Sequence, residues 1–233
     1  MKELNVCHLY GNLMNTYGDI GNLLVMDYYC KKMGVHVNYD LISLHDTFDP
    51  EKYDFVLFGG GQDFEQSVIA DDLQEKKEAL NQYIQNNGTM LAVCGGYQLI
   101  GQYYIDANGN KIPGVGALSH YTRGQEEGEE RLIGNVKIHN DHFDEDYIGF
   151  ENHGGRTFLG EGEEPLGTVL EGNGNNGTDH GEGVVYKNTF GTYFHGPILA
   201  RNENLAVRLI NIAMKERYGD DYQEVTLEEL QNK

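Results

Sequence analysis

The sequence is poor in cysteine, in basic residues and in long apolar runs, and each shortage excludes a class of protein. Its three cysteines are too few and too scattered for a disulfide framework or a metal site. The net charge of −20 argues against binding nucleic acid or anionic membranes. No apolar run approaches the roughly 20 residues that cross a bilayer, and the first residues lack a signal pattern. We therefore expect a cytoplasmic protein without direct membrane insertion.

The length of 233 residues suits one large domain, expected at 1–233 with a core at about 1–219 and a tail at 220–233. The first half alternates strand and helix patterns. We expect strands at 4–10, 35–44, 54–58 and 90–93, and helices at 21–33 and from 65 to about 88. This order predicts an α/β fold with a twisted, mainly parallel sheet between two layers of helices, which gathers ligands at the carboxyl ends of its strands.

The second half is less regular and richer in glycine and asparagine. Its patterns predict antiparallel strands that extend or flank the parallel core, at 131–138, 147–150, 183–187 and 191–194. The glycine-rich stretches 124–130 and 172–179 are expected to be solvated connections. A last helix is expected to begin at Asn202 or Asn204 and to end near Gly219, followed by a short exposed tail or helix at 226–233.

The most informative stretch is 87–101, N-G-T-M-L-A-V-C-G-G-Y-Q-L-I-G. An apolar run typical of a buried strand ends at Cys94, and two glycines lead into a helical pattern, which predicts a nucleophile elbow in cysteine form. Unpaired amides and the helix dipole would favour the thiolate there, and the amide of Gly95 would face a developing oxyanion. A free cysteine is also often a small core residue, so this stretch alone leaves both interpretations open.

A second glycine-rich turn follows the strand at 54–58 and reads G-G-G-Q-D at 59–63. Three glycines in a row cost backbone entropy and pack nothing, which indicates close approach of another group. The amide of Gly60 or Gly61 could be the second oxyanion donor. A tight turn without any ligand explains the glycines as well, and the lysine of a phosphate loop is absent.

A cysteine nucleophile needs a base, and nine histidines are available. His195 is the best placed, because it follows the predicted strand at 191–194 and precedes a stiff turn at Gly196 and Pro197. His153 is the competitor. Taken alone, each histidine is better explained as structural or exposed than as catalytic.

Four motifs occur together in order: G-G-G-Q-D at 59–63, C-G-G-Y-Q-L-I-G at 94–101, G-F-E-N-H-G-G-R-T at 149–157 and F-H-G-P-I-L at 194–199. With them, the chain resembles the cobyric-acid-synthase-like class I glutamine amidotransferases over about 9–218. Y-G-D-I-G-N at 17–22 and the segment 195–202 resemble the glutaminase subunits of lipid II isoglutaminyl synthases. The resemblance implies a three-layer, flavodoxin-like fold.

The resemblance also implies roles for single residues. Cys94 would attack the side-chain amide of L-glutamine, His195 would move the protons, and water would hydrolyse the γ-glutamyl thioester. Arg131 would hold the α-carboxylate of glutamine, a group that a guanidinium can bind through two oxygens. Gln98 and Asp63 are expected near the substrate. Glu151, His153 and Arg156 are expected to form a structural network beneath the site.

One departure from the family concerns the base. Class I triads carry a carboxylate two residues after the histidine, and here that position is Pro197. We hypothesise that a partner subunit supplies the group that orients the imidazole, or that the cysteine and histidine work poorly alone.

No ATP site is recognisable in the sequence, and no cofactor is expected in this chain. The resemblance implies a heterodimer with a Mur-ligase-like synthetase subunit, which would bind ATP, Mg²⁺ and lipid II and amidate the α-carboxyl of its D-glutamate with ammonia from this chain. Three alternatives stay open: the glutaminase subunit of another ATP-dependent amidotransferase, a non-catalytic binding subunit on the same fold, and an unrelated cysteine hydrolase with a similar elbow.

Overall fold

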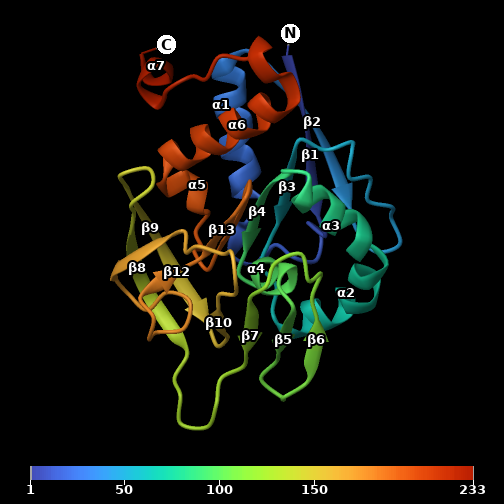
Figure 1. Cartoon of the computed structure of the whole chain (residues 1–233), viewed down its shortest axis with the longest axis vertical. Helices are drawn as coiled ribbons and strands as arrows, with labels where there is room; N and C mark the ends of the chain where they lie inside the picture. Colours follow the sequence, from blue (N-terminus) through green and yellow to red (C-terminus); the bar gives the residue numbers. More distant parts are fainter. Residues whose placement is uncertain (1, 233) are drawn as a thin grey trace.

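A computed structural model describes residues 2–232, and a six-stranded sheet is its central element (Figure 1). The strand order is β13-β14-β4-β3-β1-β2, and all neighbours are parallel except the edge strand β13. The mainly parallel sheet predicted from the sequence is confirmed. Its strands are β1 (Lys2–Leu9), β2 (Val35–Ile42), β3 (Phe55–Phe58), β4 (Thr89–Val93), β13 (Val184–Tyr186) and β14 (Thr189–Thr192).

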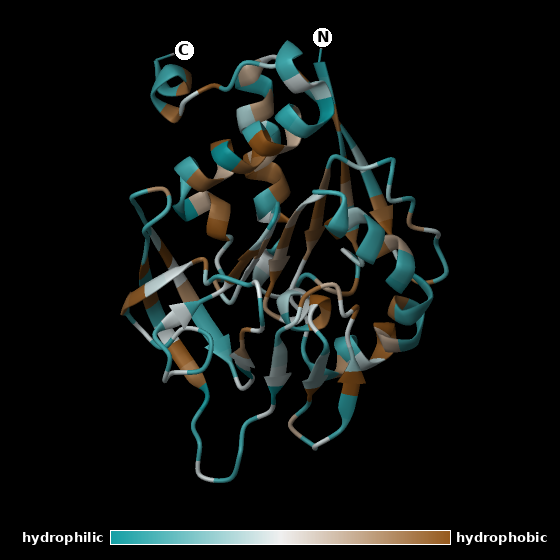
Figure 2. Ribbon diagram, in the orientation of Figure 1, coloured by the Kyte–Doolittle hydropathy of each residue, from teal (hydrophilic) through white to brown (hydrophobic). Residues whose placement is uncertain are grey.

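Helices cover both faces of this sheet, which gives the three layers. Leu57 packs into one core with α1 and α6, whereas its neighbour Phe58 packs into the other core with α2 and α3. Strand side chains alternate between faces, so a strand buried on both sides is apolar throughout, and Figure 2 shows the central strands largely in brown. The helices are α1 (Gly21–Met33), α2 (Asp63–Glu75), α3 (Lys77–Gln85), α4 (Gly95–Ile100), α5 (Ile198–Arg201), α6 (Glu203–Tyr218) and α7 (Leu227–Gln231), with 3₁₀ turns η1 (Thr16–Gly18) and η2 (Gly219–Asp221).

Two four-stranded sheets flank the core (Figure 1). Of the antiparallel strands predicted in the second half, those at 131–138 and 147–150 lie in a flanking sheet, whereas those at 183–187 and 191–194 overlap β13 and β14 of the central sheet, and β14 is parallel to β4. One has the order β10-β7-β5-β6, with strands Arg156–Phe158, Tyr121–Arg123, Tyr103–Ile105 and Lys111–Pro113. The other has the order β12-β11-β8-β9, with strands Gly181–Glu182, Gly167–Glu171, Leu132–Asn140 and Glu145–His153. β9 reaches the central sheet, because the amide of His195 donates to the carbonyl of Phe150 at 2.8 Å.

Three local predictions are corrected. The helix expected from 65 to about 88 is two helices that break at Lys76, whose buried ammonium pairs with Asp72. The strand expected at 191–194 ends at Thr192. Leu230, in the tail expected to be exposed, is buried against the helical core; position 233 lies outside the described residues. In residues 2–232, no helix is long and apolar enough to cross a membrane.

The stretch 172–179 is a solvated connection only in part, since its two ends are exposed and its middle is buried. Asn175 is fully buried, and the amides of Asn173 and Gly174 donate to the carboxylate of Glu151 at 2.8 and 2.9 Å. A buried carboxylate needs hydrogen-bond donors, and this polar loop supplies them. Its glycine and asparagine content therefore reflects packing around an internal charge.

Candidate active site

Cys94 lies where β4 turns into α4, and the predicted elbow is confirmed. Its backbone has φ 49° and ψ −104°, a strained conformation for a residue with a side chain. A Cβ atom at Gly96 would lie 2.2 Å from the carbonyl oxygen of Phe58, so only glycine fits this crossing. The half-buried sulfur differs from the other two thiols, since burial raises the pKa of both Cys7 and Cys30 to about 12.

A cleft of about 610 Å³ opens at the carboxyl ends of the strands next to Cys94. The structure brings most of the sequence-predicted site residues to this one cleft. Its lining includes Cys94, His195, Arg131, Gln98, Asp63 and Gly61.

His195 follows β14, the strand beside β4, so the tertiary structure places it against Cys94. The side chain is almost completely buried, and neither ring nitrogen makes a hydrogen bond within residues 2–232. Burial disfavours the charged imidazole, but attraction to Asp19 and to Cys94 outweighs it and raises the pKa of His195. This balance favours an imidazolium beside the sulfur.

Asp19 is a candidate within this chain for the acid that orients His195. Its Oδ1 lies 3.9 Å from Nδ1 of His195, and the carboxylate is fully buried. The gap exceeds a hydrogen bond, so the two groups interact by charge attraction. Asp19 comes from the turn after β1 rather than from the position of Pro197, which is why the spacing of the family triad did not reveal it.

The same carboxylate decides between the two predicted oxyanion donors. The amide of Gly60 donates to Oδ2 of Asp19 at 2.6 Å, which makes Gly61 the better candidate for the oxyanion donor. The amides of Gly61 and Gly95 make no hydrogen bond within the described part of the chain. They lie together, since a Cβ atom at Gly95 would be 2.9 Å from the nitrogen of Gly61. Both remain available to an oxyanion.

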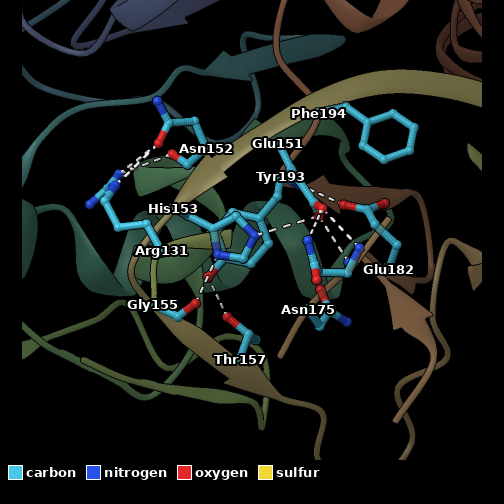
Figure 3. A network of polar contacts seen from close by, with 12 residues as sticks. Arg131, Glu151, Asn152, His153, Gly155, Thr157, Asn175, Glu182, Tyr193 and Phe194 are labelled. Atoms are coloured by element: carbon cyan, nitrogen blue, oxygen red, sulfur yellow. Dashed lines mark hydrogen bonds and ion pairs between the residues drawn. The ribbon is translucent and has the colours of Figure 1, made fainter. Parts of the chain in front are cut away.

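Arg131 directly precedes β8, after the stretch 124–130, and reaches the cleft from the flanking sheet. Its Nε and Nη2 donate to Oδ1 of Asn152 at 3.2 and 3.1 Å, and Nη2 also donates to the carbonyl of Asn152 at 3.2 Å (Figure 3). Nη1 makes no hydrogen bond within residues 2–232, which leaves this nitrogen for a ligand in the cleft. An exposed guanidinium held on one edge is suited to bind a carboxylate on the other.

Gln98 and Asp63 line the cleft with their polar atoms already engaged. Gln98 donates to the hydroxyl of Tyr193 at 3.2 Å and accepts from Gln66 at 2.9 Å. Asp63 accepts from the hydroxyl of Tyr104 at 2.8 Å and from a backbone amide at 3.1 Å. Both residues therefore fix the wall of the cleft.

Part of the network expected beneath the site is present (Figure 3). Nε2 of His153 lies 3.9 Å from the carboxylate of Glu151, whereas Arg156 donates to the backbone carbonyls of Gly154 and Glu130. The ring of His153 stacks on Tyr193 at 3.5 Å, and its Nδ1 lies 2.8 Å from the carbonyl oxygen of Gly155. Burial lowers the pKa of His153, which suits a neutral structural imidazole. Glu182, which sequence reasoning missed, lies in the same network and accepts from the amide of Tyr193 at 2.7 Å.

Sequence reasoning also gave no role to Asp19 or Tyr17, although both lie in the motif at 17–22. The available signal was positional. β1 pairs with β3, so an acid shortly after β1 reaches the same sheet edge as the triple glycine.

Known proteins resemble the chain over most of its length. It is 60% identical over 221 residues to "Lipid II isoglutaminyl synthase (glutamine-hydrolyzing) subunit GatD" of Streptococcus pneumoniae, which covers 95% of this chain and 84% of the relative. It is 38% identical to the subunit of the same name from Staphylococcus aureus, over 93% of this chain and 87% of the relative.

Solved structures share the fold. A glutamine amidotransferase crystal structure superposes with a TM-score of 0.60 at 15% identity, over 89% of this chain and 98% of that one. The glutaminase domain of Trypanosoma brucei CTPS with bound acivicin gives 0.57 at 11% identity, over 95% and 96%. Residues 5–203 match the CobB/CobQ-like glutamine amidotransferase domain, and the chain belongs to this family of glutamine amidotransferases.

Proposed function

We propose that this protein is the glutamine-hydrolysing subunit of a lipid II isoglutaminyl synthase. The observation that carries the proposal is the Cys94 elbow facing His195 and Asp19, in a chain 60% identical to a relative with that name. The cleft has the parts that acyl transfer needs: a nucleophile, a base with an orienting acid, and two convergent amides.

In the first half of the reaction, the Cys94 thiolate attacks the side-chain carbonyl carbon of L-glutamine. The amides of Gly61 and Gly95 donate to the oxygen as it becomes negative. The imidazolium of His195 gives its proton to the departing amide nitrogen, which leaves as ammonia. Arg131 binds the α-carboxylate and so aligns the amide with the sulfur.

In the second half, water hydrolyses the γ-glutamyl thioester. His195 takes a proton from the water, glutamate leaves, and the ion pair of thiolate and imidazolium is restored. Asp19 stabilises the imidazolium throughout, because its buried charge stays beside Nδ1. This assignment gives the isolated chain its own orienting acid, in place of the partner-supplied group expected from the sequence.

The ammonia would serve a synthetase partner. We propose a heterodimer with a Mur-ligase-like subunit that binds ATP, Mg²⁺ and lipid II and amidates the α-carboxyl of D-glutamate. The names of the relatives support a multisubunit enzyme, since both are called a subunit. The free thiols and a need for ATP suit the cytoplasm.

The test is release of ammonia and glutamate from glutamine by the purified chain, alone and with the synthetase. We expect release by the parent chain alone, faster release in the complex, and none by Cys94→Ala in either state. Cys30→Ala, which changes a buried thiol of α1, is the matched control and should keep the activity.

A folded Cys94→Ala variant that still supports glutamine-dependent amidation by the complex would contradict the proposal. That outcome would assign the chain to the non-catalytic alternative and make the elbow a purely architectural feature.

A further inference from the structure

Tyr17 lies over the catalytic imidazole although much of it is exposed. Its ring centroid is 4.6 Å from that of His195, at an interplanar angle of 48°, and 52% of the residue is accessible. Its backbone has φ 59°, in the left-handed region that a residue with a side chain rarely adopts. The preceding amide, that of Thr16, donates to the carbonyl of Gly60 at 2.9 Å, which anchors this turn beside the glycine turn.

One side chain joins this tyrosine to the arginine of the cleft. Asn152 donates through Nδ2 to the hydroxyl oxygen of Tyr17 at 2.6 Å, and its Oδ1 accepts from Nε and Nη2 of Arg131. The guanidinium can only donate, so the orientation of the Asn152 amide is fixed and its nitrogen must face Tyr17. The Tyr17 hydroxyl accepts this bond and keeps its own proton for another partner.

The strand that carries Asn152 also holds the backbone of the catalytic histidine. Phe150 of β9 accepts from the amide of His195 at 2.8 Å, and Asn152 follows two residues later. β9 therefore contacts His195 twice, directly through Phe150 and through Asn152 by way of the Tyr17 ring. Figure 3 shows Asn152 and Arg131 facing each other.

We propose that Asn152 and Tyr17 are positioning residues that complete the carboxylate site of Arg131 and link it to His195. The inference rests on the proposed hydrolysis of glutamine. A substrate carboxylate at the open Nη1 end of Arg131 meets a guanidinium whose other edge is fixed by Asn152. The side-chain amide of Asn152 also holds the ring of Tyr17, which lies over the imidazole of His195. A substrate whose carboxylate binds Arg131 therefore has its amide next to a correctly oriented His195.

The experiment compares two reagents that alkylate Cys94, one with the α-carboxylate and one without. The first is the diazoketone analogue of L-glutamine, and the second is iodoacetamide. Tyr17→Phe keeps the ring and removes the hydroxyl. It should lower the rate at which the diazoketone alkylates Cys94 about tenfold, the effect of one hydrogen bond near a charge. It should leave the iodoacetamide rate within about twofold. Tyr28→Phe is the control, because Tyr28 of α1 is also 52% exposed.

A second variant tests whether the two residues act through the same bond. Asn152→Ala should also slow only the diazoketone, and the double variant should be no slower than Asn152→Ala alone. Arg131→Lys should also slow alkylation by the diazoketone, and the size of this loss is the reference against which the losses of the other variants are compared.

Suppose that the parent hydrolyses glutamine and that Tyr17→Phe slows alkylation by both reagents equally. This result would overturn the link between the Arg131 site and His195, and it would leave the glutaminase proposal standing. Additive losses in the double variant would overturn it as well. A folded parent that neither reacts with the diazoketone nor hydrolyses glutamine would overturn both proposals.

Discussion

The carboxylate of Asp19 lies between two parts of the proposed catalytic site, since its Oδ1 is 3.9 Å from Nδ1 of His195 and its Oδ2 accepts from the amide of Gly60. One buried charge thus raises the pKa of the histidine and fixes the glycine turn that borders the oxyanion site. The first two predictions concern this arrangement.

Asp19→Asn should lower kcat for glutamine hydrolysis about 100-fold, the usual scale of acid–base catalysis. Asparagine can still accept the bond from Gly60, but it removes the charge that favours the imidazolium. KM should change little, because Asp19 is fully buried and interacts with His195 and Gly60 rather than with Arg131. Steady-state kinetics check this, with Asp27→Asn on the exposed face of α1 as control. An unchanged kcat would mean that another group orients His195.

Gly60→Ala should lower kcat about 100-fold with little loss of thermal stability. The new methyl group would lie 3.1 Å from Oδ2 of Asp19 and 3.3 Å from both Cβ of Cys94 and Cε1 of His195, so these groups must shift. Kinetics and melting temperatures measure the two effects. Gly181→Ala, whose nearest contact is a proline side chain at 3.3 Å, is a control outside the cleft. Full activity in Gly60→Ala would contradict the tight packing of the site.

Arg131→Lys should raise KM for glutamine about tenfold or more and leave kcat within a few-fold. Lysine keeps the charge but cannot hold Asn152 along one edge and a carboxylate along the other. Initial rates over a range of glutamine concentrations separate the two constants. Arg217→Lys, which alters an ion pair with Asp54 remote from the cleft, should behave like the parent. A fall in kcat alone would place Arg131 outside substrate binding.

Glu182→Gln should change how stability depends on pH. Burial raises the pKa of Glu182 to about 8, so the folded state holds its proton more tightly than the unfolded state does. Its contribution is therefore complete below the unfolded pKa near 4.5 and is lost as the pH rises through 8, at about 1.4 kcal/mol per pH unit.

Urea denaturation at several pH values between 5 and 9 measures this slope. The free energy of unfolding of the parent should fall with rising pH more steeply than that of Glu182→Gln. Glu216→Gln, an exposed change on α6, should keep the slope of the parent. Parallel curves for parent and Glu182→Gln would show that Glu182 ionises normally.

Local signals in the sequence settled most elements of the central parallel sheet and its first helix. Alternation and apolar runs predicted the parallel strands, and helix α1 has the predicted bounds, with Gly34 at φ 72° as its cap. The elbow at Cys94 was equally visible, because a buried strand, a nucleophile and two glycines are adjacent in the chain. Such features depend only on residues that are adjacent in the chain, and the sequence gives this adjacency directly.

The contacts between distant segments were decided by the tertiary structure alone. Asp19 reaches His195, and Tyr17 reaches Asn152, only because the segments that follow β1 and β14 meet each other and β9. No spacing in the sequence encodes which acid faces the imidazole or which amide the acid occupies. Likewise, the polar loop at 172–179 looked solvated until the buried charge of Glu151 required its donors. The sequence determined the parts of the site, and packing determined which of those parts meet.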